Sequence, residues 1–112
     1  MKFIRILTLE LDDLTEDIEQ LMALDKSRCE KGEISNYVYL ENTSLLKNEI
    51  SCLSSLGKFV ASVDPEGFET VSALLDHITG GFRTLRKEGC YSPAIESMVL
   101  RKLQKVFTFV ES

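Results

Sequence analysis

The residue best suited to take part in a chemical reaction is His77, the only histidine among the 112 residues of the chain. Gly80 and Gly81 follow it at i+3 and i+4, the positions that neighbour a side chain on the same face of a helix. Two glycines there leave a notch beside the imidazole. Phosphoryl transfer between proteins needs such a space, because a partner's carboxylate must approach the ring nitrogen in line. The pattern therefore marks His77 as a candidate phosphoacceptor, with Gly80 and Gly81 forming the notch.

The segment His77-Ile78-Thr79-Gly80-Gly81 resembles the motif of histidine-containing phosphotransfer domains, and the resemblance covers residues 77–81 only. In that family a histidine on a bundle helix is followed by a lysine at i+3 and a glycine at i+4. Gly81 matches the glycine, whereas Gly80 stands where the lysine would steady the phosphate. Two long helices usually follow the histidine helix in the family, but only residues 93–110 remain for one here. The resemblance implies a signalling role for His77, and the alternative is an ordinary surface histidine beside a glycine kink or a close helix crossing.

Two pairs of glutamates have the i, i+3 spacing that lets two carboxylates on one helix share a metal ion. They are Glu16 with Glu19, and Glu30 with Glu33. All-α nucleotide pyrophosphohydrolases build magnesium sites from such pairs, although their second pair ends in Asp on another helix. Because the second pair here straddles Gly32 at a predicted helix end, we interpret these residues as a solvated acidic face. A metal-dependent hydrolase is the third functional hypothesis, and the sequence predicts neither a metal site nor a cofactor.

Other catalytic signatures are absent from the sequence. It contains no glycine-rich dinucleotide motif, no phosphate loop and no His-Glu-x-x-His zinc motif. The chain is therefore expected to be non-catalytic.

The three cysteines, Cys29, Cys52 and Cys90, form an odd set without a CxxC pair. A disulfide framework uses an even set in an oxidising compartment, and a zinc site uses closely spaced ligands. We therefore expect three reduced, buried thiols. The N-terminal apolar run is interrupted by Arg5 and Glu10 and has no small-residue cleavage site, so the predicted location is cytoplasmic. No run of eighteen uncharged apolar residues occurs, so no membrane partner is expected.

Charge is distributed unevenly along the chain. The 18 acidic residues outnumber the 13 basic residues, for a net charge of −5, which argues against nucleic acid as a partner. Residues 80–112, however, carry six basic and three acidic residues. We expect this last third to attract the acidic remainder within one fold.

Three breaks divide the chain into four segments with helical apolar periodicity, at Lys31-Gly32, at Asp64-Pro65 and across residues 89–93. The first segment has an apolar seam at alternating steps of three and four residues. This favours a helix from near residue 3, although residues 3–9 are also rich in strand-forming residues. The seam consists of Ile4, Leu7, Leu11, Leu14, Ile18 and Leu21.

The remaining segments differ in how clearly they begin. The second runs from Ser35 to about Val63, with Asn42 or Ser44 as alternative caps of a shorter helix. The third opens on an Asp64 cap and Pro65 and continues through the glycine pair to about residue 87, and the fourth opens on Ser92-Pro93. Four amphipathic helices with short loops predict an all-α, antiparallel, up-down four-helix bundle over a single domain of residues 1–112. We expect a small protein–protein interaction or regulatory module with an unidentified protein partner, which forms a homodimer through the Ile4–Leu21 seam.

Overall fold

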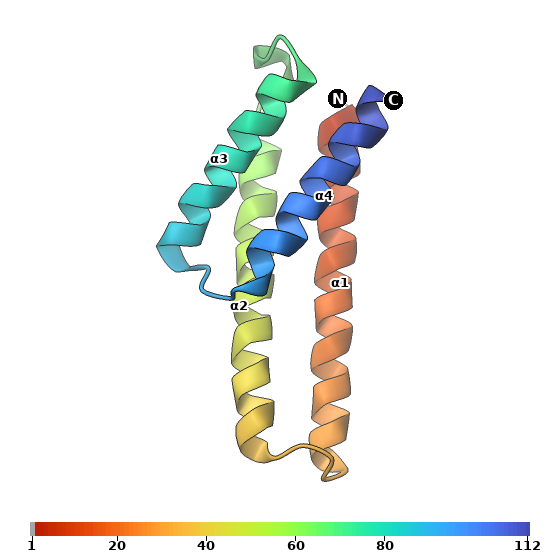
Figure 1. The fold of residues 1–112 in the computed structure, drawn as a ribbon, viewed down its shortest axis with the longest axis vertical. Helices are drawn as coiled ribbons and strands as arrows, with labels where there is room; N and C mark the ends of the chain where they lie inside the picture. The colour runs from red at the N-terminus through yellow and green to blue at the C-terminus, as the bar shows by residue number, and fades with distance from the viewer. Residues whose placement is uncertain (1) are drawn as a thin grey trace.

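The computed structural model describes residues 2–112, which contain four α-helices and no strand. They are α1 (Lys2–Glu30), α2 (Asn36–Ser62), α3 (Val71–Gly89) and α4 (Ala94–Glu111). Consecutive helices run in opposite directions (Figure 1). The predicted all-α antiparallel up-down bundle is therefore confirmed. No helix within residues 2–112 is both long and apolar enough to cross a membrane.

The first helix is continuous from residue 2, so residues 3–9 are helical rather than extended. Its buried residues recur at steps of three and four residues, which keeps one side of the helix against the core. Those residues are Phe3, Leu7, Leu11, Leu14 and Ile18. The apolar spacing that predicted a helix therefore also forms the face of α1 that packs in the core.

The turn between α1 and α2 uses a glycine and a serine cap. Gly32 has φ of 75°, a left-handed conformation that glycine adopts without steric cost. The hydroxyl of Ser35 accepts a hydrogen bond from the backbone N–H of Val38 at 3.1 Å and caps α2. The shorter helix that Asn42 or Ser44 would have capped is therefore not formed.

The predicted start of the third helix at Pro65 is wrong. Asp64 does cap a turn, but that turn is a single 3-10 turn, η1 (Pro65–Gly67). Phe68 returns to an extended conformation, and α3 begins only at Val71, where the Thr70 hydroxyl accepts from the N–H of Ala73. Gly67 lowers helix propensity two residues after the proline, and Thr70 supplies a second cap.

The helix α3 continues through Gly80 and Gly81 to Gly89, as predicted. The predicted cap of α4 is wrong in one respect. Ser92 is fully buried, and its hydroxyl donates to the Glu49 carboxylate at 2.7 Å instead of capping the helix. Glu49 lies on α2, so this serine serves tertiary packing rather than the helix end.

The two helix pairs differ in length, and this difference shapes the molecule. The helices α1 and α2 have 29 and 27 residues, whereas α3 and α4 have 19 and 18. The shorter pair covers only the upper part of the long hairpin, and α4 crosses it from α2 toward the N-terminal end of α1 (Figure 1). Burial follows this arrangement, because the last buried residue of α1 is Ile18 and the first buried residue of α2 is Glu49. The hairpin therefore extends past its cover in a molecule 54 Å long.

Candidate functional site

The histidine lies on the surface of α3, as its helical phase predicted. Its ring sits between two aromatic rings contributed by other segments. The centroid of the imidazole is 5.0 Å from that of Phe68 and 5.5 Å from that of Phe59, with both pairs tilted. These separations are typical of favourable aromatic contacts. His77 therefore links α3 to α2 and to the segment before α3 while one side stays exposed.

The two glycines that follow His77 have different surroundings. A Cβ atom built at Gly81 would overlap the ring of Phe59, whereas one built at Gly80 would meet nothing within 4 Å. The expected notch is thus occupied on the Gly81 side by an aromatic ring, and only the Gly80 side is open. Gly81 serves the close packing of Phe59 against α3, one of the two roles that the sequence left open.

The acidic pairs are not assembled into a site. Glu16 and Glu19 are exposed on α1, Glu30 is the last residue of that helix, and Glu33 lies in the following turn. Glu33 Oε2 is 3.6 Å from Arg28 Nε, an exposed ion pair of small energetic value. Within residues 2–112 no group of three or more His, Cys, Asp or Glu side chains is placed to hold a metal ion.

The apolar seam of α1 is used mainly inside the chain. Four of its six members, Leu7, Leu11, Leu14 and Ile18, belong to the core, and Ile4 is half-buried against that core. Leu21 is 50% exposed and begins the part of the hairpin that the other helices leave bare. Most of the seam is therefore closed to a second chain, and only its C-terminal end is available.

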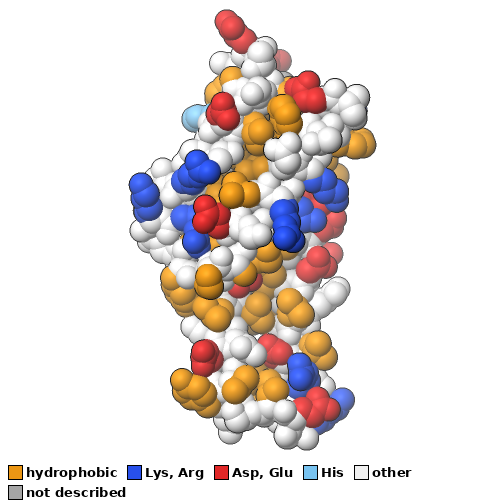
Figure 2. Space-filling view, viewed as in Figure 1, with side chains coloured by type: hydrophobic (Ala, Val, Ile, Leu, Met, Phe, Trp, Pro, Cys, Tyr) orange, Lys and Arg blue, Asp and Glu red, His pale blue; other side chains and the backbone are white. Residues whose placement is uncertain are grey.

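We call residues 19–30 of α1 and residues 36–47 of α2 the uncovered end of the hairpin. At 1.5 Å per residue, each stretch is about 18 Å long. Figure 2 shows hydrophobic side chains gathered over this lower part of the molecule, with a few charged side chains between them. Its large exposed hydrophobic residues are Leu21, Leu24, Tyr37, Val38 and Leu40, with exposed fractions of 50%, 52%, 76%, 40% and 65%.

A shallow groove of about 180 Å³ runs between α1 and α2 where the uncovered end begins. Leucines form its walls, and two carboxylates and one amide lie among them. The lining residues are Leu21, Asp25, Asn42, Leu45, Leu46 and Glu49. The groove therefore offers an apolar surface with acidic groups within it.

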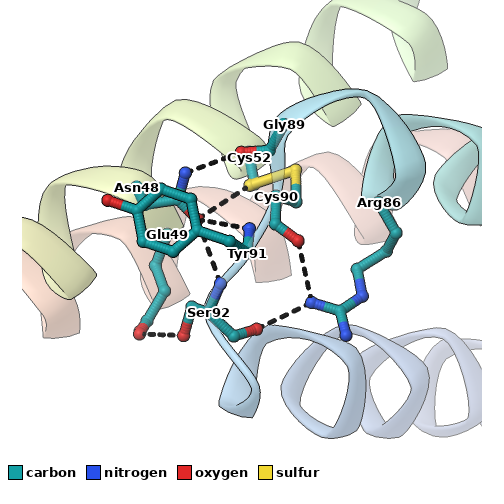
Figure 3. Close-up of a disulfide and its surroundings, with 8 residues drawn as sticks. All are labelled: Asn48, Glu49, Cys52, Arg86, Gly89, Cys90, Tyr91 and Ser92. Atoms are coloured by element: carbon teal, nitrogen blue, oxygen red, sulfur yellow. Dashed lines mark hydrogen bonds between the residues drawn. A yellow bond between two sulfur atoms is a disulfide. The ribbon is translucent and has the colours of Figure 1, made fainter.

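Directly above this groove, the connector between α3 and α4 is fastened to α2 (Figure 3). The amide of Asn48 donates to the carbonyl of Gly89 at 2.7 Å. Its oxygen accepts from the backbone N–H groups of Tyr91 at 3.0 Å and Ser92 at 3.2 Å. One side chain thus satisfies three backbone groups that no helix pairs.

Arg86 fastens the same connector from α3. Its Nη1 donates to the carbonyl oxygens of Cys90 at 3.0 Å and Ser92 at 2.7 Å (Figure 3). Arg86 Nη2 also lies 3.7 Å from Glu96 on α4. The phenol of Tyr91 reaches α2 through the hydroxyl of Ser44 at 3.1 Å. The lower edge of the α3–α4 layer is therefore fixed in position.

A disulfide between Cys52 and Cys90 completes this attachment, with the two Cα atoms 5.7 Å apart (Figure 3). The expectation of three reduced, buried thiols is therefore wrong for these two cysteines, which are oxidised. Cys29 alone is free within residues 2–112, and it is half-buried rather than buried. The disulfide was not predicted because an odd number of cysteines argued against a disulfide framework. Its only sequence signal is that Cys52 has the helical phase of the buried Leu53 and Leu56 while Cys90 lies in a break.

Comparison with known proteins finds no family model, no curated protein and no solved structure that matches this chain.

Proposed function

We propose that this chain is a non-catalytic helical module that binds a protein through the uncovered end of its hairpin. The observation that carries the proposal is the set of five large hydrophobic side chains, 40% to 76% exposed, on a two-helix layer without a cover. A concentration of exposed large hydrophobic side chains at one end of a soluble protein often marks a site of interaction with another protein. The rigid attachment of α3 and α4 supports the proposal, since it prevents that layer from sliding down to cover the surface.

A photo-crosslinking amino acid at position 24 tests the proposal in cells that produce the full chain. Leu24 is 52% exposed on the uncovered end, so a bound protein would lie within reach of the probe. The matched control carries the same amino acid at Ser72, an exposed residue of α3. We expect a covalent adduct, identified by mass spectrometry of its peptides, from position 24 and not from position 72. Equal labelling from both positions, or none from position 24, contradicts the proposal.

Phosphotransfer through His77 is the second candidate function, and the exposure of this histidine on a bundle helix supports it. A phosphorylated receiver domain would donate the phosphoryl group from its aspartyl phosphate to an imidazole nitrogen and regain a free carboxylate. The ring of Phe59 beside Gly81 restricts the approach of a receiver domain to the His77 imidazole from one side.

Incubation with such a receiver should place an acid-labile, base-stable phosphate on the chain if His77 is the acceptor. The variant His77→Gln should abolish the label. Its loss of stability should be small, because the substitution is at the surface and Gln keeps part of the contact with Phe68. Absence of label on the unaltered chain removes this function and leaves the docking proposal unaffected.

A cytoplasmic location is the sequence-based prediction, and the disulfide bears on it because disulfides persist mainly in oxidising compartments. Rapid alkylation of thiols during cell lysis gives a direct test. Modification of all three cysteines supports the cytoplasm, whereas modification of Cys29 alone supports an oxidising compartment.

A further inference from the structure

Four exposed residues of α1 form a stripe that starts just before the uncovered end and continues along it. Asp17, Leu21, Leu24 and Arg28 are separated by four, three and four residues. At 3.6 residues per turn they fall within an arc of about 60° around the helix. All four side chains are exposed, and the two leucines are 50% and 52% accessible. The stripe is a continuous surface with an acid at one end, a base at the other and two leucines between them.

The order of this stripe is self-complementary in one orientation. Because the spacing reads the same from either end, an antiparallel second copy places Leu21 opposite Leu24 and Asp17 opposite Arg28, twice over. We propose that a second copy of this chain docks on the uncovered end through an antiparallel pairing of the two α1 stripes. This inference rests on the proposed interaction function and names its partner.

The parallel alternative is disfavoured by charge and by shape. In a parallel pairing Asp17 would face Asp17 and Arg28 would face Arg28, and like charges directly opposite each other repel. Glu10 lies seven residues before Asp17 on the same side of α1 and contacts Lys102 of α4, so a parallel pairing would also bring the α4 helices of both copies to the same level. The antiparallel arrangement satisfies the two-fold symmetry of most homodimers.

The charges of the uncovered end and its turn are nearly balanced, which makes this end a better surface for self-association than the acidic remainder of the chain. Residues 19–47 carry five acidic and four basic side chains, whereas the whole chain carries 18 acidic and 13 basic side chains. Two copies therefore approach with little repulsion through this end. The footprint of two helices over about 18 Å is small for an interface, so we expect a weak dimer that dissociates in the micromolar range.

Sedimentation equilibrium of the purified full chain measures this association. The dimer should be present at about 100 μM and should dissociate at least tenfold more readily in the variant Leu21→Glu, which places a carboxylate between two leucines. Leu9→Glu is the matched control, because Leu9 is a 63% exposed leucine of the same helix that lies outside the stripe. An equal effect of both variants contradicts the proposed surface. Circular dichroism confirms that each variant remains folded.

Charge reversal tests the antiparallel register. Asp17→Arg or Arg28→Asp alone places like charges opposite each other at both ends of the stripe, and each should weaken the dimer about tenfold. The double variant restores opposite charges and should regain most of the affinity. Failure of the double variant to recover overturns the antiparallel pairing.

The experiments distinguish failure of the second-copy inference from failure of the proposed interaction function. A chain that stays monomeric at about 500 μM overturns the second-copy inference, and crosslinking from position 24 to a different protein then still supports the interaction function. Crosslinking from position 24 to peptides of this same chain supports both.

Discussion

At the scale of single residues, two adjacent glycines in α3 have different physical roles. Gly80 faces open space, so its missing side chain leaves the helix less stable and provides no packing contact. Gly81 lets the ring of Phe59 pack directly against the helix backbone. The sequence alone does not distinguish the two positions.

We predict opposite effects of alanine at these positions. Gly80→Ala should raise the free energy of unfolding by about 0.5–1 kcal/mol, because alanine is the better helix former and finds no obstacle. Gly81→Ala should lower it by about 1 kcal/mol, because the overlap with Phe59 costs more than the gain in helix propensity. Urea denaturation measures both, and equal stabilisation by the two variants would show that Phe59 moves aside without cost.

The amide of Asn48 is the second residue whose role depends on tertiary contacts. Replacing it with alanine removes three hydrogen bonds to the connector and should cost about 2 kcal/mol of unfolding free energy. Asn42→Ala is the control, since Asn42 is a half-buried asparagine of the same helix that takes no part in the amide hydrogen bonds to the connector found within residues 2–112. The midpoint temperatures of thermal unfolding of the two variants should differ by several degrees, and coincident unfolding curves would contradict the role of Asn48.

At the scale of the elements, the sequence is most informative where one periodic signal dominates. The step of three and four residues predicted α1 and the continuation of α3 through its glycines, because burial of one helix face determines both. It failed at the start of α3, where Asp64-Pro65 and Thr70 offer competing caps only six residues apart. It also failed at Ser92, whose partner Glu49 lies 43 residues away and is joined to it only by the fold.

The candidate site was predicted unevenly for the same reason. The exposure of His77 follows from helical phase alone. The Phe59 ring beside Gly81 and the bare end of the hairpin depend on how far α3 and α4 reach along α2, which local patterns do not encode.

The disulfide between α2 and the connector is expected to stabilise the whole arrangement of elements. It closes a loop with a sequence separation of 38 residues, for which loss of chain entropy in the unfolded state corresponds to about 2–4 kcal/mol. The double variant Cys52→Ala/Cys90→Ala should lose free energy of unfolding by that amount and keep its helical spectrum. Cys29→Ala should change little, and a reducing agent should destabilise the unaltered chain but not the double variant.

At the scale of the whole molecule, the basic last third does contact the acidic first helix. The carboxylate of Glu10 accepts from Lys102 Nζ at 3.0 Å and lies 2.7 Å from Lys105 Nζ, joining α1 to α4. Hydrogen bonds from Lys105 and Lys102 lower the pKa of Glu10 below its ordinary value, and these outweigh the opposing effect of desolvation.

This lowered pKa predicts how stability depends on pH. A carboxylate whose pKa is depressed in the folded state contributes stability above the pKa of the unfolded state, about 4.3 for Glu, and loses it as the pH falls through the folded value. Glu10→Gln should therefore cost about 1 kcal/mol at pH 7, and this cost should disappear as the pH falls below the lowered pKa of Glu10 in the folded state. Glu19→Gln, at an exposed site on the same helix, is the matched control and should leave the free energy of unfolding nearly unchanged at pH 7. A Glu10→Gln deficit that is constant with pH would contradict the ion-pair origin.

The unequal lengths of the two helix pairs also imply a gradient of local opening along the hairpin. Amide hydrogens in the covered half should exchange with solvent only through global unfolding, because the clamped connector and the core must both come apart. Those of residues 19–47 should exchange through fraying that leaves the rest intact, since their helical turns rest on one neighbouring helix alone. If two copies pair there, protection of these amides rises with protein concentration while that of the covered half stays constant.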